Sequence, residues 1–230
     1  MRERLDLFHR GDRDYLQGSL ILSQAVAAFA RTHGPDEPRP VAVTRASFRA
    51  IARRHCVVVD AAPPDGASLA SALLRLDGGG VRSLFVVEDE GRPEPPPRMP
   101  DPPGLVLGWE GGEALSAKAS LSPLDSLDAL VSALVQVDRR AFADARPWAR
   151  NVFLLSIFDT ALPLDLEAFA RGARVVVSLE HHRRTGERNV IVQHVVLEGE
   201  GAPPLALRMM CSWEESPDRE PVLPRRAGGA

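Results

Sequence analysis

This chain of 230 residues is poor in cysteine, lysine and long apolar runs. Its two cysteines, Cys56 and Cys211, both lie in apolar segments typical of strands. Buried free thiols are therefore expected, because an unpaired buried cysteine behaves as a small apolar residue. Lys118 is the only lysine, and arginines and acids are interspersed to a formal net charge of -3. This balance gives no electrostatic reason to expect nucleic acid or an anionic membrane as a partner.

Long apolar segments are missing as well. No run reaches the roughly 18 apolar residues that a membrane span requires. No cationic start leads into an apolar stretch with a cleavage site. We therefore expect a cytoplasmic protein with no membrane partner. The chain also lacks a P-loop, a dinucleotide-binding fingerprint and a serine nucleophile elbow, so no cofactor is expected.

What the sequence does contain is one pattern of elements that occurs twice. An apolar, helix-like run at 18–31 precedes a strand that begins at Val41, and a similar run at 128–141 precedes a strand that begins at Asn151. Both offsets, 18 to 41 and 128 to 151, are 23 residues. Four strand-like segments follow in matching order in each half: 41–48, 56–59, 73–78 and 83–88 in the first, and 151–158, 174–177, 195–199 and 207–214 in the second. Repetition at this length predicts a duplicated domain.

Proline and glycine divide the chain. Residues 90–104 are acidic and proline-rich, cannot sustain a helix or a central strand, and are expected to link a first half, 1–89, to a second half, 105–215. Residues 216–230 are expected to be a disordered tail. Within the second half, Thr185-Gly186 lies between two valine-rich runs and predicts the turn of a hairpin.

Both helix-like runs are apolar around most of their circumference. Such a helix is buried on several sides, as when a sheet curls around it. Two buried helices and about eight long antiparallel strands predict an α+β architecture.

This architecture resembles the hotdog fold, and local sequence supports the likeness. Hotdog β-hydroxyacyl carrier-protein dehydratases carry a histidine nine residues before a glycine that leads into the central helix, and His9 and Gly18 keep that step. The segment 43–51 is similar to the family's strand with a Phe-Arg pair, and 169–177 with 197–199 is similar to the turns and strands of hotdog sheets. The resemblance implies a tandem (double) hotdog, with two long antiparallel sheets each wrapped around a central apolar helix. It implies an intramolecular pseudo-dimer and leaves a homodimer of that unit open.

The same resemblance implies an acyl thioester as ligand, carried on coenzyme A or an acyl carrier protein. In such dehydratases a histidine of one hotdog and an acid of its partner exchange protons with the substrate, and amides at a helix start polarise the thioester carbonyl. His9 corresponds to the catalytic base and Gly18 to the amide, with Gln17 and Ser23 as further substrate-binding residues.

The chain departs from the family at the acid. Ser23 occupies the position of the family's catalytic acid in the first half. In the second half, Ala119 occupies the position of the histidine and Ala133 that of the acid. Asp128, at the start of the second helix, is the substitute we choose as the second catalytic residue. Asp14 and Asp125 are the alternatives.

Whether the protein is an enzyme is left open by these departures. The first reading is a 3-hydroxyacyl-thioester dehydratase or an acyl thioesterase of fatty-acid, polyketide-type or secondary metabolism. The alternative is a catalytically degenerate hotdog that binds acyl chains or a partner protein. A weaker alternative is a synthase of the γ-butyrolactone autoregulator type.

The remaining polar and aromatic residues are interpreted structurally. His181, His182 and His194 with Cys211 match no zinc-binding spacing, so no metal site is expected. Asp138, like Asp125 and Asp128, is most simply a helix-cap or polar-face residue. The three tryptophans, 109, 148 and 213, are expected to be core or interface aromatics.

Overall fold

The chain folds into two compact units. The computed structural model describes residues 1–32, 37–92, 94–101, 104–112, 115–185 and 188–216. Unit 1 comprises Met1–Pro103, Ser126–Asp128 and Phe158–Leu166, and unit 2 comprises Gly104–Asp125, Ala129–Ile157 and the chain from Glu167 on. The predicted tail after Ser216 and the glycine of the predicted turn, Gly186, lie outside the described residues.

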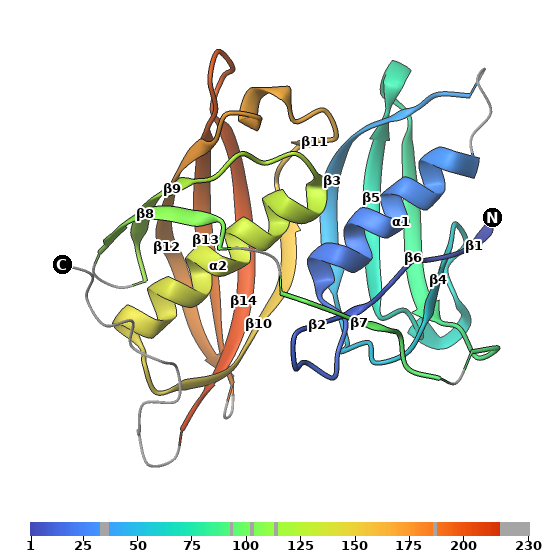
Figure 1. Cartoon of the computed structure of the whole chain (residues 1–230), viewed down its shortest axis with the longest axis horizontal. Coiled ribbons are helices and arrows are strands. Elements are labelled where there is room, and N and C mark those ends of the chain that lie inside the picture. The colour runs from blue at the N-terminus through green and yellow to red at the C-terminus, as the bar shows by residue number, and fades with distance from the viewer. Residues whose placement is uncertain (33–36, 93, 102–103, 113–114, 186–187, 217–230) are drawn as a thin grey trace. The chain divides into compact units, whose positions relative to one another are not determined.

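Unit 1 is an antiparallel sheet with one long helix, α1 (Gly18–Thr32) (Figure 1). Its strands are β1 (Arg2–Arg4), β3 (Pro40–Phe48), β4 (Cys56–Val59), β5 (Ala70–Leu76) and β6 (Val81–Glu88). They pair in the order β1-β4-β6-β5-β3, and β11 (Leu162–Pro163) pairs with β3. A separate two-stranded ladder joins β2 (His9–Arg10) in parallel to β7 (Arg98–Met99). Two 3-10 turns, Pro64–Gly66 and Asp77–Gly79, lie in its connections.

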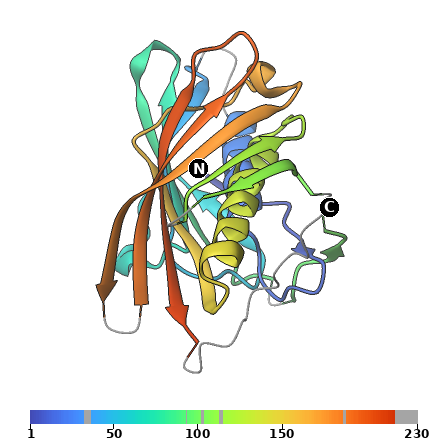
Figure 2. The ribbon, with the colours of Figure 1, turned by 90° about the vertical axis from the view of Figure 1, so that its left-hand side faces the viewer.

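Unit 2 repeats the plan around α2 (Leu127–Ala145). Its strands are β8 (Val106–Gly111), β9 (Ala117–Leu121), β10 (Ala149–Phe158), β12 (Ala173–Thr185), β13 (Arg188–Glu198) and β14 (Leu205–Glu215). They pair in the order β10-β14-β13-β12-β9-β8. A 3-10 turn, Glu167–Phe169, precedes β12. In Figure 2 the orange and red strands β12–β14 lie to one side of the yellow helix α2, and the green strands β8 and β9 cross in front of it.

The two helices are buried as their sequences predict. Of the fifteen residues of α1, eight are buried: Ser19, Leu20, Ile21, Leu22, Ala25, Val26, Ala28 and Phe29. In α2 the buried residues recur at three- and four-residue steps, from Leu127 through Leu130, Leu134 and Phe142. Phe142 meets the ring of Trp213 on β14 edge-on at 5.8 Å. On another side of α2, Asp144 accepts a hydrogen bond from the indole of Trp109 on β8. Strands therefore contact α2 from more than one direction, which is the wrapped arrangement expected.

The order of helix and strands along the chain is as predicted in both halves, but the order of strands in the sheets differs between the units. In unit 2, β12, β13 and β14 are neighbours in succession. In unit 1, β5 lies beside β3, and β6 lies between β5 and β4. The connections explain the difference. The β12–β13 hairpin closes at Thr185 and Arg188, which forces adjacency, whereas the longer β4–β5 connection contains Pro63 and Pro64 and allows the chain to pass β6.

Two strand pairings were not anticipated. The first is that of β1, which pairs with β4 through Arg2 and Val59. The second involves the proline-rich segment, part of which, β7, pairs with β2. The amide of His9 donates to the Pro97 carbonyl at 2.8 Å, and the amide of Gly11 donates to that of Met99 at 2.9 Å. Prolines are tolerated in such short edge pairings. The boundaries 1–89, 90–104 and 105–215 stay a prediction.

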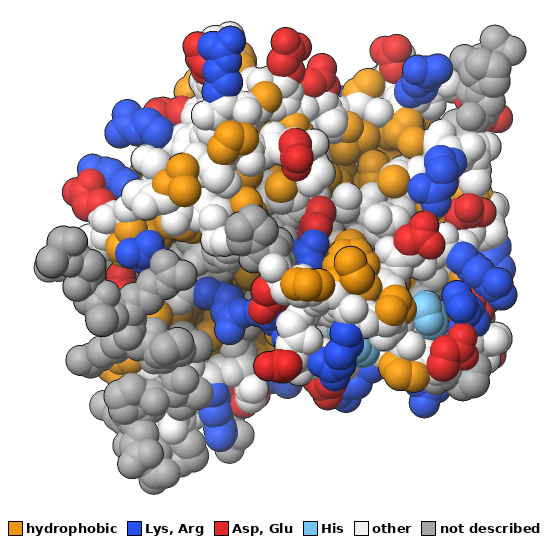
Figure 3. Space-filling view, viewed as in Figure 1, with side chains coloured by type: hydrophobic (Ala, Val, Ile, Leu, Met, Phe, Trp, Pro, Cys, Tyr) orange, Lys and Arg blue, Asp and Glu red, His pale blue; other side chains and the backbone are white. Residues whose placement is uncertain are grey.

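The last features of the fold are its charged surface and its two cysteines. Figure 3 shows basic and acidic side chains interspersed over the face seen in Figure 1. Neither helix of the described chain is both long enough and apolar enough to cross a membrane. Cys56 and Cys211 are buried and free, as predicted. Burial raises the pKa of the Cys56 thiol to about 12, so that thiol is a packing group and not a nucleophile.

Candidate functional site

The candidate site lies in unit 1, where β2 meets the start of α1. The side chain of Arg10 is 7% exposed and forms an ion pair with Asp128, which is 19% exposed. Its other terminal nitrogen donates to Oε1 of Gln17 at 2.8 Å. Arg10 therefore ties β2 to the residue before α1 and to the first turn of α2. A buried guanidinium needs such partners, because an unpaired buried charge is strongly destabilising.

His9 is buried beside this arrangement, with 4% of its surface exposed. Its Nε2 atom is enclosed and has no hydrogen-bond partner within the described chain. The pairing of β2 with β7 explains the burial, because it holds the backbone of His9 against Pro97. An enclosed ring nitrogen without a partner is uncommon and is chemically available to a bound molecule.

The structure brings together four of the five residues singled out in the sequence, with Arg10 as a sixth that was missed. Gln17, Gly18 and Asp128 gather around Arg10 or beside it, and His9 is its neighbour in β2. The carboxylate of Asp128 contacts Arg10 and not His9. Ser23 lies further along α1, half-buried. No local pattern marks Arg10, since a lone arginine near a chain start normally indicates an exposed residue.

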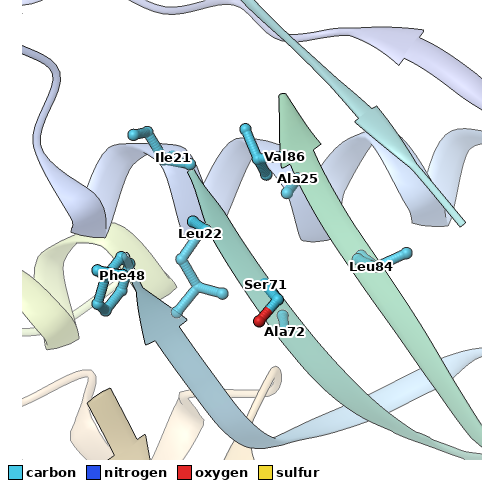
Figure 4. Close-up of a pocket in the computed structure, with 9 residues that line it drawn as sticks. Ile21, Leu22, Ala25, Phe48, Ser71, Ala72, Leu84 and Val86 are labelled. Atoms are coloured by element: carbon cyan, nitrogen blue, oxygen red, sulfur yellow. The ribbon is translucent and has the colours of Figure 1, made fainter. Parts of the chain in front are cut away.

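An apolar cavity lies between α1 and the sheet of unit 1 (Figure 4). Its volume is about 10 Å³, which is at the lower limit for a single water molecule. The residues that line it are Ile21, Leu22, Ala25, Phe48, Ala70, Ser71, Ala72, Leu84 and Val86. The ring of Phe48 also packs on Gly18, where a Cβ atom would lie only 2.8 Å from two of its carbons. Glycine at the helix start is thus required for this contact.

Unit 2 contains a buried polar cluster that the sequence interpretation missed. Asp138 on α2 is 4% exposed and not the polar-face residue expected. Burial raises its pKa to about 6, although hydrogen bonds from the Cys211 thiol and the Gln193 amide act in the opposite direction. Burial also raises the pKa of Cys211, and the adjacent Asp138 raises it further. Asp138 follows Leu134 by four residues and precedes Phe142 by four, so its place on the buried stripe was visible in the sequence.

The histidines on β12 and β13 do not form a metal site with Cys211. Nε2 of His182 lies 2.9 Å from Oδ1 of Asn189, and the His182 ring stacks on Trp213 at 6.2 Å. Cys211 contacts Asp138 instead. Across the described ranges, no group of three or more potential ligands is placed to hold a metal ion. Trp213 is a core aromatic, as expected, at 2% exposure.

Comparison with solved structures identifies the fold. A conserved protein with a hotdog fold from Alicyclobacillus acidocaldarius is similar over 89% of this chain and 89% of its own, with a TM-score of 0.50 and 14% identity. The tesB protein of Mycobacterium avium subsp. paratuberculosis matches with a TM-score of 0.51 and 14% identity, covering 93% of this chain and 94% of its own. The dehydratase domain of RzxB from Pseudomonas fluorescens matches with a TM-score of 0.51 and 11% identity, covering 93% and 88%.

These likenesses confirm the predicted hotdog fold over nearly the whole chain. No protein-family profile matches the sequence, and no curated protein is similar to it in sequence.

Proposed function

We propose that this protein binds an acyl thioester and acts on it as a dehydratase-like or thioesterase-like hotdog protein. The observation that best supports the proposal is the arrangement of side chains at the start of α1. There an enclosed histidine with a free ring nitrogen lies next to the Arg10–Asp128 ion pair, and Phe48, which packs against Gly18, lines an apolar cavity. The names of the tesB protein and the RzxB dehydratase domain support the same chemistry. The carrier in this proposal is coenzyme A or an acyl carrier protein.

In this proposal each residue has a distinct role. Nε2 of His9 accepts a proton from the substrate or from an attacking water, which requires an enclosed and unoccupied base. The backbone at Gly18, at the positive end of the α1 dipole, polarises the thioester carbonyl. In dehydration, Asp128 leaves Arg10, takes up a proton from solvent and delivers it to the leaving hydroxyl, while His9 holds the proton removed from the substrate. In hydrolysis, Asp128 stays with Arg10 and only the base is needed.

The proposal is tested by mass spectrometry with purified protein and two substrate classes, 3-hydroxyacyl thioesters and plain acyl thioesters. We expect water loss or hydrolysis, reduced by a factor on the order of 100 to 10,000 in His9→Ala. Asp128→Asn distinguishes the reactions, since dehydration should be lost and hydrolysis largely kept. His55→Ala removes another buried histidine of unit 1 and serves as the matched control. Turnover that is the same in His9→Ala and wild type contradicts the assignment of His9.

A specific observation also favours the second reading, an acyl-binding protein without catalytic activity. Asp128 is already engaged by Arg10, and the position where the family carries an acid is the half-buried Ser23. Binding of a non-hydrolysable acyl thioether analogue, with no turnover of either substrate class by wild type, establishes this reading in place of the first.

The cellular setting completes the proposal. Two buried thiols that remain free fit a reducing cytoplasm. The assembly of the two hotdog units into an intramolecular pseudo-dimer, or into a homodimer of it, also stays part of the proposal. Size-exclusion chromatography with light scattering distinguishes the monomer from the homodimer.

A further inference from the structure

We infer that residues 97–101 form a strap that holds the segment carrying His9, and that a ligand reaches Nε2 of His9 only when this strap opens. The inference rests on the proposed function only in taking that ligand to be an acyl thioester. The strap and the segment that it holds both belong to unit 1.

The strap is attached to residues 9–13 by backbone hydrogen bonds. β7 pairs in parallel with β2, and this ladder is separate from the main sheet. The two strands lie side by side below the start of α1 in Figure 1. The amide of His9 donates to the Pro97 carbonyl, and the amide of Gly11 donates to the Met99 carbonyl. A two-stranded ladder on its own is at best marginally stable in water, so these bonds alone do not keep the strap closed.

Two side-chain contacts fasten the strap further, and both lie at the surface. A guanidinium nitrogen of Arg98 donates to the Gly11 carbonyl at 3.0 Å. Arg13 forms an ion pair with Asp101, and the two side chains are 26% and 51% exposed. Exposed contacts of this kind contribute little each and are screened by salt. The strap is therefore held by weak contacts that can break while the rest of unit 1 stays folded.

The strap is exposed, whereas the residues that it holds are buried. All five of its residues are exposed, so opening it takes little apolar surface out of the core. His9 and Arg10 point to opposite faces of β2, yet both are buried. Within the described residues, β2 pairs with no strand other than β7. Opening of the strap thus leaves the edge of β2 unpaired at His9 and frees the residue that carries the enclosed Nε2.

Proline makes the strap move as one piece. Pro97 and Pro100 lie within it, and Pro95 and Pro96 come immediately before it. Each proline fixes its own φ, and a proline-rich segment is stiff over several residues. Such a segment breaks its contacts together and not one at a time. Pro96 is buried and anchors the strap at its first end.

The test is carbethoxylation of histidines by diethyl pyrocarbonate at neutral pH, with the rate at each histidine followed by mass spectrometry of peptides. In wild type, His9 should react more slowly than the exposed His181 and His182. The double variant Arg98→Ala/Asp101→Ala lacks both side-chain contacts of the strap, and its His9 should react about ten times faster than that of wild type. An equal rate at His9 in the two proteins overturns the inference, and so does a wild-type His9 that reacts as fast as His181.

Two controls separate opening of the strap from other causes. Arg92→Ala breaks an exposed ion pair with Glu94 in the same proline-rich segment but outside the strap, and it should keep the wild-type rate at His9. His55, another buried histidine of unit 1, should react at the same rate in all variants. If His55 reacts faster as well, unit 1 has unfolded. Asp101→Ala alone then decides, with a smaller increase at His9 expected.

Hydrogen exchange identifies the motion. The amides of His9 and Gly11 donate to carbonyls of the strap, so they exchange when the strap opens. In the double variant both amides should exchange faster, by the same factor as the carbethoxylation of His9. Faster carbethoxylation without faster exchange at these amides means that the ring moves independently of the strap, which overturns the inference.

Thioester turnover is measured separately on the same variants. Faster carbethoxylation in the double variant, with no turnover by any variant, supports the strap and contradicts the proposed function. Turnover that is lost in His9→Ala, with equal carbethoxylation in wild type and the double variant, supports the proposed function and overturns the strap.

Discussion

At the residue scale, the most consequential side chain outside the candidate site is Asp138. Its folded pKa of about 6 exceeds its ordinary value of 3.8, chiefly because burial disfavours the charged carboxylate. The folded state therefore binds this proton more tightly than the unfolded state. The resulting stabilisation is fully present below pH 3.8 and is lost as the pH rises through about 6.

The substitution Asp138→Asn should remove this dependence. Between pH 4 and pH 7 the free energy of unfolding of wild type should decrease by about 2 kcal/mol relative to the variant, because a pKa shift contributes about 1.4 kcal/mol per unit and the unfolded carboxyl is already partly ionised at pH 4. Urea denaturation at both pH values measures it. Asp125→Asn changes an exposed aspartate and should keep the wild-type slope. A wild-type slope in Asp138→Asn as well means that the carboxylate is solvated.

At the element scale, Arg10 fastens β2 to the starts of both helices. Arg10→Ala leaves Asp128, 19% exposed, and Gln17 without this partner, and should destabilise unit 1 by about 3 to 5 kcal/mol. Arg171→Ala breaks an ion pair with Glu200 whose members are 80% and 64% exposed, and should cost less than about 1 kcal/mol. Chemical denaturation of the two variants measures the difference. Equal small effects from both contradict a structural role for Arg10.

The same scale shows what the sequence was able to predict. Both helices and the main strands could be predicted from apolar periodicity, because a stripe of leucine and valine on one face of an element is stable only when that face is buried. The burial of His9 depends on Pro97 and Met99, far along the chain, and local patterns carry no information about such pairings. The neighbours of β5 depend on how the chain passes from Val59 to Ala70, which strand propensity does not specify. Phe48 was identified as a strand residue, but its contact with Gly18 required coordinates.

At the scale of the whole molecule, the structural units and the sequence halves are not the same objects. The duplicated pattern suggests a division near the proline-rich segment, but unit 1 also contains Ser126–Asp128 and Phe158–Leu166. Leu162 is fully buried there and pairs with Val43 of β3. A residue from late in the sequence thus belongs to the first sheet. The part of the molecule that a substitution of Leu162 destabilises therefore tests the division of the chain into these two units.

Leu162→Ala should destabilise unit 1 by about 2 to 5 kcal/mol, the range for truncating a buried leucine. Hydrogen exchange should then accelerate at amides of β3 and β5 and stay unchanged at β13. Leu207→Ala, at a buried position of β14, is the matched control and should show the opposite pattern. Uniform acceleration in both variants means that the two units unfold as one cooperative structure. Accelerated hydrogen exchange confined to one unit means instead that each hotdog unit unfolds with its own free energy. A substitution in the buried cluster of Asp138 can then be made without disturbing the site at Arg10.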